Sequence, residues 1–309
     1  MVGALSALSD TVGYNPADVD IVVGTSAGSV LAAMLGCGLT VADIIERLDV
    51  DAQSHSTNDG AADASDVHAA LRSIPKTLPI PGNLRLAAKT VAHPRRHTVM
   101  TLASGLAPRG RGTLAPLAGM IANIQGGAGW PTAPTTWIVA MDYVNGQRVV
   151  FGKSGAPTAA LPDAVVASSS APGSFPPALV DGQLYLDGGA VSMTNADVLA
   201  AEHLDEILIL APKTTFAPSR QRPPTTRTDR RLRDMHTRHL VCEQRRLEAA
   251  GAAVHVLAPT LPDLHSMGAN MMDPTRRREV LHTALWATRK QILAETAAML
   301  TPRPHIREA

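Results

Sequence analysis

Apolar positions along the chain form short continuous runs that alternate with longer amphipathic stretches. The runs are rich in β-branched residues and predict strands at 19–23, 135–144, 147–151, 183–191, 205–210 and 252–259. The amphipathic stretches predict helices at 3–8, 26–36, 41–48, 164–171, 196–204, 226–250 and 274–300. Continuous β-branched runs are typical of parallel strands that are covered on both faces. The pattern therefore predicts an α/β fold, a three-layer α/β/α sandwich with a mostly parallel central sheet.

Local signals mark where several of these elements begin and end. The pair Asn145-Gly146 lies between two β-prone runs and predicts a type I′ hairpin turn. Thr40 is expected to cap the helix that follows it, with Asp43 completing a capping box. Thr194-Asn195 is expected to start a further helix.

The alternation of strands and helices predicts a single domain over residues 1–309, with one interruption. Residues 51–130 contain a polar stretch followed by a segment broken by proline and glycine, and we interpret them as an insertion or lid-like segment. Residues 211–309 are interpreted as a C-terminal helical and strand extension of the same domain.

Composition narrows the class of protein further. Hydrophobic residues make up 45% of the 309 positions, charged residues 18% and aromatic residues 3%, and the formal net charge is +1. This balance excludes an acidic disordered chain and a strongly basic nucleic-acid binder. Cys37 and Cys242 lie far apart in sequence and match no metal-ligand spacing, so we expect two buried free thiols, no metal site and no cofactor.

Targeting signals are the last feature that composition addresses. No secretory signal pattern opens the sequence, and no apolar run reaches the roughly 18 residues of a membrane-spanning helix. We therefore expect a cytoplasmic protein, with peripheral contact at the inner membrane surface as an additional expectation.

A serine follows the first predicted strand in a distinctive setting. The residues Gly24-Thr25-Ser26-Ala27-Gly28 form a G-x-S-x-G pattern that joins a buried strand to a helix. In that context a sharp turn places the serine hydroxyl at the carboxyl end of the sheet, and the positive end of the helix dipole favours negative charge nearby. Ser26 is therefore a candidate nucleophile, and its four neighbours are candidate supports of the turn. The alternative is an ordinary helix-capping serine.

A serine nucleophile needs a base, and a carboxylate occurs at the end of another strand. Asp187 is followed by Gly188 and Gly189, which remove side-chain bulk beside it. A strand-end carboxylate of this kind can come within hydrogen-bonding reach of a serine on a neighbouring strand. Ser26 and Asp187 are thus a candidate catalytic dyad, and a simple Asp-Gly turn is the alternative.

These motifs resemble those of the bacterial patatin-like phospholipase family, which uses a serine in G-x-S-x-G and an aspartate in D-G-[GA]. The segment from Ala167 to Pro177 resembles the family's A-S-x-A-x-P-x-x-F-P-P segment, and the resemblance covers residues 1–210 apart from the interruption. It implies a serine hydrolase that cleaves acyl esters of phospholipids or related lipids through an acyl-enzyme. The residues that it places beside the active site are Ser169, Pro172, Phe175 and Asn195.

The start of the sequence departs from that family pattern. The family's first strand ends in a G-G-G-x-[KR]-G loop whose backbone N–H groups form an oxyanion hole, and Val2–Leu8 resembles the helix after that loop. We therefore expect that the sequence is truncated at its N-terminus. Loss of an oxyanion donor costs about 10²- to 10³-fold in rate, so we expect reduced activity from the chain as given.

Two alternative functions remain open at the level of sequence. A conventional Ser-His-Asp esterase would recruit His255 or His265 as its base. A lipid-binding or scaffold protein would keep the fold without catalysis. His255 is expected in the core, however, and His236, His239 and His282 on surface helices.

A basic segment is the last candidate for function. Residues 67–141 contain no Asp or Glu, and we expect them to contact an anionic membrane. The eight basic residues are Arg72, Lys76, Arg85, Lys89, Arg95, Arg96, Arg109 and Arg111. A solvated loop and a lid over the acyl pocket are the alternatives, and the scarcity of aromatic residues disfavours nucleic acid. A second basic run, at 220–246, contains acidic residues and is expected to be a salt-bridged surface helix.

Overall fold

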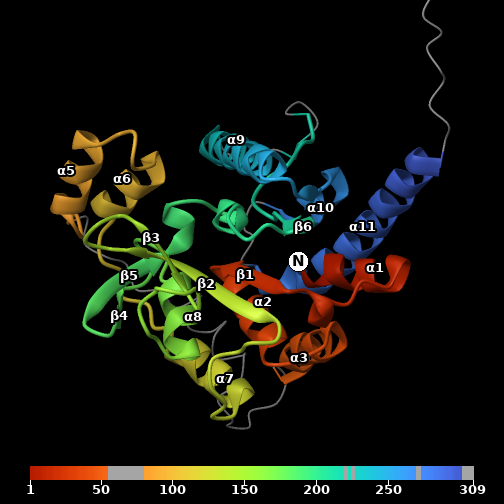
Figure 1. Cartoon of the computed structure of the whole chain (residues 1–309), viewed down its shortest axis with the longest axis horizontal. Coiled ribbons are helices and arrows are strands. Elements are labelled where there is room, and N and C mark those ends of the chain that lie inside the picture. The colour runs from red at the N-terminus through yellow and green to blue at the C-terminus, as the bar shows by residue number, and fades with distance from the viewer. Residues whose placement is uncertain (55–79, 219–221, 224–226, 269–272, 301–309) are drawn as a thin grey trace, which may run out of the picture.

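The α/β class predicted from the sequence is confirmed by the three-dimensional structure (Figure 1). The computed structural model describes residues 1–54, 80–218, 222–223, 227–268 and 273–300. Its strands are β1 (Ile21–Thr25), β2 (Thr135–Asp142), β3 (Arg148–Phe151), β4 (Ala178–Val180), β5 (Gln183–Asp187), β6 (Glu206–Leu210) and β7 (Ala253–Leu257).

Helices surround these strands on both sides (Figure 1). The α-helices are α1 (Val2–Val12), α2 (Ala27–Gly36), α3 (Val41–Ser54), α5 (Leu84–Ala92), α6 (Val99–Leu106), α7 (Ala115–Gln125), α8 (Leu161–Ser169), α9 (Arg227–Ala249), α10 (Leu261–Met267) and α11 (Arg277–Leu300). Short 3₁₀ turns include η2 (Gly188–Ala190) and η3 (Ala196–Leu199). None of the helices in the described part of the chain is both long and apolar enough to cross a bilayer.

The strands form a mixed five-stranded sheet and a separate two-stranded sheet. The parallel pairs, β1 with β2 and β6 with β7, are joined by helical crossovers, whereas β3, β4 and β5 pair antiparallel to their neighbours. Thr25 pairs with Val139 and Asp187 pairs with Ala140, both on the edge of β2 opposite β3. Consequently, the carboxyl ends of β1 and β5 meet at adjacent positions of the central strand.

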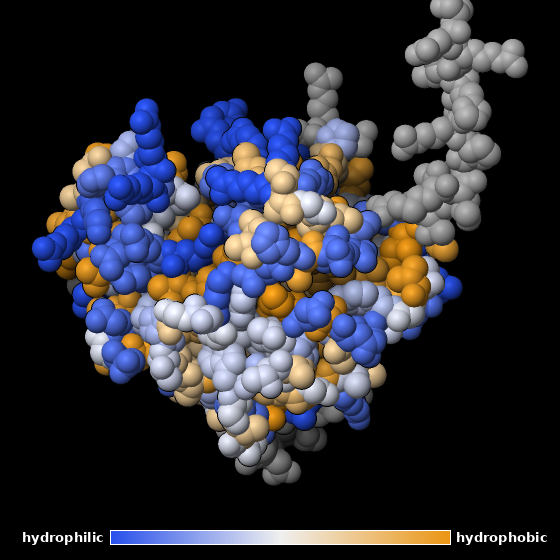
Figure 2. All heavy atoms as spheres, in the orientation of Figure 1, coloured by the Kyte–Doolittle hydropathy of each residue, from blue (hydrophilic) through white to orange (hydrophobic). Residues whose placement is uncertain are grey.

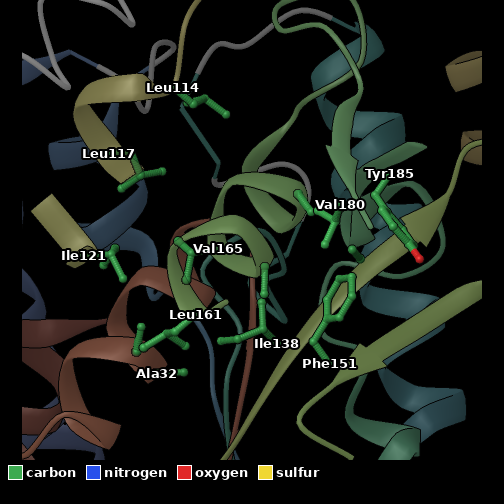
Figure 3. Packing of buried hydrophobic residues seen from close by; sticks show 14 of the residues in the cluster. Ala32, Leu114, Leu117, Ile121, Ile138, Phe151, Leu161, Val165, Val180 and Tyr185 are labelled. Atoms are coloured by element: carbon green, nitrogen blue, oxygen red, sulfur yellow. The ribbon is translucent and has the colours of Figure 1, made fainter. Parts of the chain in front are cut away.

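Alternating residues of β2 divide the core between the two faces of the sheet. On one face, Ile138 and Ala140 pack against α2, α7 and α8, as Figure 3 shows for the labelled side chains. On the other face, Trp137 packs with residues of η3, β6 and α9. The two clusters produce the predicted layers of helix, sheet and helix, because every second side chain of a strand points to the same face.

Over its described residues 80–130, the segment that the sequence marks as an interruption contains α5, α6 and α7. Residues 55–79 of that segment, including Arg72 and Lys76, lie outside the described residues. Leu117 and Ile121 of α7 are buried in the main core (Figure 3), so the end of the segment is integral to the domain rather than an addition to it. Proline and glycine between these helices interrupt the apolar pattern, so the sequence does not predict them.

Several predicted element boundaries are confirmed and others are corrected. Thr40 and Asp43 form the predicted capping box, with reciprocal hydrogen bonds of 2.8 and 3.2 Å. The hairpin between β2 and β3 is present, but its turn is not type I′, because Gly146 has a positive φ and Asn145 does not. The Asp142 side chain instead accepts backbone N–H bonds from Val144 and Asn145 and closes a longer loop.

Other local predictions are wrong for reasons of tertiary structure. Asn195 is followed by the single turn η3 rather than by a full helix. Cys37 is half-buried and Cys242 is exposed, so the expectation of two buried thiols fails. His255 is exposed and pairs with Glu206 at 3.2 Å, because β7 has one described strand partner and presents this side chain outward.

His236 is buried on α9, although it was expected on a surface, and this predicts a pH-dependent stability. Burial, and then the charges of Lys213, His239 and Arg233, lower its pKa from 6.5 to about 4. As the pH falls below 6.5, the unfolded chain binds this proton first, so the free energy of unfolding decreases until about pH 4. We expect the melting temperature of His236→Gln, measured by circular dichroism, to fall less than that of the wild type between pH 6.5 and about pH 4.

The same replacement at His282, which is exposed on α11, serves as the control. An equal loss of melting temperature in wild type and His236→Gln would mean that His236 does not contribute to acid sensitivity.

Candidate active site

Ser26 occupies a strained turn between β1 and α2. Its backbone has φ 55° and ψ −125°, a conformation rare for a residue with a side chain. Gly24 makes the turn possible, because a Cβ atom there would lie 2.4 Å from the carbonyl oxygen of Gly28 and 2.5 Å from Cα of Ser29. The strand–turn–helix context that the sequence predicts around Ser26 is therefore present.

Neighbouring serines hold the turn by hydrogen bonds to its backbone. The N–H group of Ser26 donates to Oγ of Ser168 at 2.9 Å, and that hydroxyl donates to the carbonyl of Val139 at 2.6 Å. The hydroxyl of Ser29 donates to the carbonyl of Ser26 at 2.6 Å. Ser168, fully buried near the end of α8, is not among the residues predicted from the sequence, where the family resemblance selects its neighbour Ser169.

Asp187 lies at the end of β5, where that strand meets β1. Its side chain is buried and accepts the N–H group of Gly189 at 2.7 Å, and it lies close enough to the Ser26 hydroxyl for that group to act on its pKa. Burial raises the pKa of Asp187 above its ordinary 3.8, while the Gly189 N–H group, the Ser26 hydroxyl and the charge of Lys213 oppose the rise. The structure thus brings the two predicted dyad residues together.

Both glycines after Asp187 are needed for this approach. A Cβ atom on Gly188 would lie 2.6 Å from the carbonyl oxygen of Val139, and one on Gly189 would lie 3.1 Å from Oδ1 of Asp187. Side chains at these positions would push β5 away from β2 or displace the carboxylate. This geometry agrees with the interpretation, made from the sequence, that the paired glycines avoid side-chain bulk beside Asp187.

Asn195 lies behind the site and does not line it, contrary to the sequence expectation. It is fully buried, and its Nδ2 donates to Oγ1 of Thr25 at 3.1 Å and to the carbonyl of Gly188 at 3.3 Å. These two partners directly adjoin Ser26 and Asp187. Asn195 therefore connects the ends of β1 and β5 through its amide group.

A charged network supports Asn195 from outside. Arg148 donates to its Oδ1 at 3.3 Å and pairs with Asp197 at 2.5 Å. Burial acts to raise the pKa of Asp197, but its bonds and charge interactions with Arg148 and Arg246 outweigh burial and lower it. Glu243 of α9 is buried, which raises its pKa, and it binds the Thr194 hydroxyl and the N–H group of Ala196.

A cavity of about 1850 Å³ opens beside Ser26 and Asp187. Its walls are mostly apolar and include Met100, Leu117 and Phe175. From there the cavity continues between β1 and β6, which are not hydrogen-bonded to one another. An elongated apolar ligand with one polar end fits such a space.

The predicted lining residues divide into two groups. Ser169, Pro172 and Phe175 line the cavity, as do Thr25, Ala27, Gly28 and Gly189. The Ser169 hydroxyl is buried and has no hydrogen-bond partner among the described residues. Gly24 and Gly188, in contrast, support the walls from behind.

Lys213 also lines the cavity and was not predicted from the sequence. It follows β6 by three positions, and the carboxyl ends of strands in α/β sheets are where ligands bind. Its location after a strand is the signal that could have identified it. Its charge acts on Asp187 and also on His236.

None of the histidines in the described part of the chain completes a conventional triad. Among the hydrogen bonds of the described residues, none joins a histidine to Ser26 or Asp187. His265 is exposed, and its ring nitrogen contacts the carbonyl of Leu261 at 2.8 Å. His255, which also lines the cavity, pairs with Glu206 at the start of β6.

A serine at a strand–helix elbow, facing a buried carboxylate at the carboxyl end of an α/β sheet, is typical of α/β acyl hydrolases. The family model for patatin-like phospholipases matches residues 1–200, a region that includes Ser26, Asp187 and Asn195. The chain therefore belongs to the patatin-like phospholipase family, and its membership indicates lipid acyl hydrolase activity. A comparison with curated proteins finds no match.

Proposed function

We propose that this protein cleaves acyl ester bonds of phospholipids or related lipids, with Ser26 as nucleophile and Asp187 as general base. The observation that carries the proposal is the approach of these two side chains to one another beside a large apolar cavity. Burial of a carboxylate is unfavourable unless the group has a compensating role. The burial of Asp187 therefore also supports a functional site.

The reaction follows from the positions of these two groups. Asp187 accepts the proton of the Ser26 hydroxyl as Oγ attacks the ester carbonyl. Collapse of the tetrahedral intermediate returns the proton to the departing alcohol and leaves the acyl group on Oγ. Asp187 then removes a proton from a water molecule, whose oxygen attacks the acyl-enzyme, and the fatty acid and free Ser26 are released.

Two electrostatic features support these steps. Helix α2 begins at Ala27 with no side-chain cap, so its first N–H groups and its dipole can stabilise negative charge next to Ser26. The raised pKa of Asp187 makes the carboxylate a stronger base than a solvated one. Because the ionised form is the base, activity should appear as the pH rises through that pKa.

The direct test is acyl release from defined substrates. We expect the purified chain to liberate fatty acid from phospholipid or lysophospholipid vesicles and to hydrolyse short p-nitrophenyl esters, both detected by product formation. Ser26→Ala provides the matched blank. A chain that binds these lipids without releasing acid would instead be the lipid-binding or scaffold protein that the sequence left open.

A further inference from the structure

Helices α5 and α6 expose an apolar stripe to solvent, the reverse of the usual pattern. The stripe residues recur at i, i+4 and i+7 on each helix and are Leu84, Ala88 and Val91 on α5, and Val99, Ala103 and Leu106 on α6. The exposed fractions of Val91 and Val99 are 67% and 72%. Surface helices of this size normally turn such stripes inward, so this one indicates a surface that is covered by a partner.

The opposite faces of the two helices are well anchored. Leu86 is fully buried against Met141 and Leu186, and Thr101 is almost fully buried. At Gly105, an added Cβ atom would lie 2.8 Å from the backbone nitrogen of Ala87, which shows how closely the helices pack. The outward stripe is thus a fixed feature of a packed helix pair.

Positive charge surrounds the stripe. Arg85, Lys89, Arg95 and Arg96 are exposed on or just after α5, and no acidic residue occurs at any position from 67 to 141. Hydrophobic and hydrophilic side chains accordingly lie side by side over this end of the molecule in Figure 2. Exposed apolar residues ringed by basic ones complement an anionic lipid surface, where acyl chains and phosphate groups meet.

We propose that the α5–α6 surface docks on an anionic lipid surface. Residues 80–106 contain no Phe, Tyr or Trp, which argues against single-stranded nucleic acid, since that ligand is held by base stacking. A protein partner would not require the absence of acidic residues throughout the segment. The charge pattern therefore favours lipid over the other occupants.

The same helix pair connects the docking surface to the candidate active site. Met100 and Ser104, on another side of α6, line the cavity that contains Ser26. The hydroxyls of Thr98 and Thr101 both donate to the carbonyl of Ala190, at 3.1 and 3.0 Å, three residues after Asp187. Docking would hold the cavity next to the bilayer; this consequence rests on the proposed function, whereas the docking itself does not.

Vesicle co-sedimentation of the Ser26→Ala protein tests the docking without lipid breakdown. We expect binding to phosphatidylcholine vesicles that contain phosphatidylglycerol, and little binding to phosphatidylcholine alone. Binding should weaken with salt, because the screening length falls from about 10 Å at 0.1 M to about 3 Å at 1 M. Each basic residue near an anionic surface contributes about 1 kcal/mol, or roughly fivefold in affinity.

Two double variants separate the apolar and electrostatic parts. Both Val91→Glu with Val99→Glu and Arg95→Glu with Arg96→Glu should weaken binding by at least about tenfold. Matched controls on distant helices are Leu293→Glu on α11 and Arg238→Glu on α9, both exposed in the free protein and expected to bind normally. Hydrolysis of a soluble ester, measured on the same changes made with Ser26 intact, should be unaltered.

Three results would overturn the proposal. They are binding to neutral vesicles that ignores salt, binding that survives both double variants, and a dimer in sedimentation velocity that Val91→Glu with Val99→Glu converts to monomer. The last result would assign the stripe to a second copy of the chain. Vesicle binding without any esterase activity would leave the docking surface intact and refute only the proposed function.

Discussion

Replacing Ser26 by alanine or Asp187 by asparagine is expected to reduce kcat/KM for a short p-nitrophenyl ester by at least about 10³-fold. Alanine removes the nucleophilic oxygen, and the amide of asparagine cannot accept the serine proton. The fold should persist in both variants, and Asp187→Asn should melt at the same or a higher temperature, because burial of that carboxylate raises its pKa and so disfavours its charged form.

Suitable controls are Ser9→Ala on α1 and Asp181→Asn in the β4–β5 turn, both exposed positions where turnover should be unchanged. If Asp187→Asn kept near-normal turnover while His265→Ala lost it, the dyad would be wrong and a conventional triad would replace it.

Gly24→Ala is expected to lower the free energy of unfolding by about 1–3 kcal/mol and to remove most of the activity. The new methyl group would collide with the backbone of Gly28 and Ser29, at distances near 2.5 Å, and would displace the turn that carries Ser26. Urea unfolding gives the stability, and ester hydrolysis gives the effect on the site.

Gly28→Ala is the matched control, because it changes the other glycine of the same motif. No atom outside its own helix lies within 4 Å of a Cβ at Gly28, and its φ is not in the left-handed range. Alanine is favoured over glycine in helices by up to about 1 kcal/mol, so this variant should be as stable as the wild type or more so. Equal destabilisation by both changes would show that the close packing at Gly24 is not what the motif requires.

The parts of the site that local sequence patterns encode could be predicted. Ser26 and Asp187 each end a β-prone run and are followed by glycine or a small residue, and both are recognisable without knowledge of contacts. What brings them together is the register of β1 and β5 on β2, where Thr25 and Asp187 pair with consecutive residues. The α/β alternation predicts that strand ends meet, although it does not specify this register.

Part of the surroundings of the dyad depends on contacts between distant segments, which no local sequence pattern encodes. Asn195 was expected at the cavity wall, but its amide connects Thr25 to Gly188, and its orientation depends on Arg148, 47 residues earlier in the chain. Glu243 reaches the same loop from α9. Polar side chains of this kind look like solvated surface residues until the tertiary structure buries them.

The predicted burial of two histidines, His236 and His255, is the reverse of what the structure shows, for a related reason. His255 lies in an apolar run that resembles core but is exposed on β7, whereas His236 lies in an arginine-rich helix and is buried. The residues next to a histidine in sequence indicate only the average environment of the helix or strand that contains it. Which face of that element meets the core is decided by packing partners elsewhere in the chain.

The central claim, that Asp187 activates Ser26, is tested most directly by the rate at which a fluorophosphonate probe modifies the chain, followed by peptide mass spectrometry. We expect a single adduct on the peptide that contains Ser26, formed at least about 10²-fold more slowly in Asp187→Asn. An adduct on a different hydroxyl, or an equal rate of labelling at Ser26 in the wild type and Asp187→Asn, would contradict it.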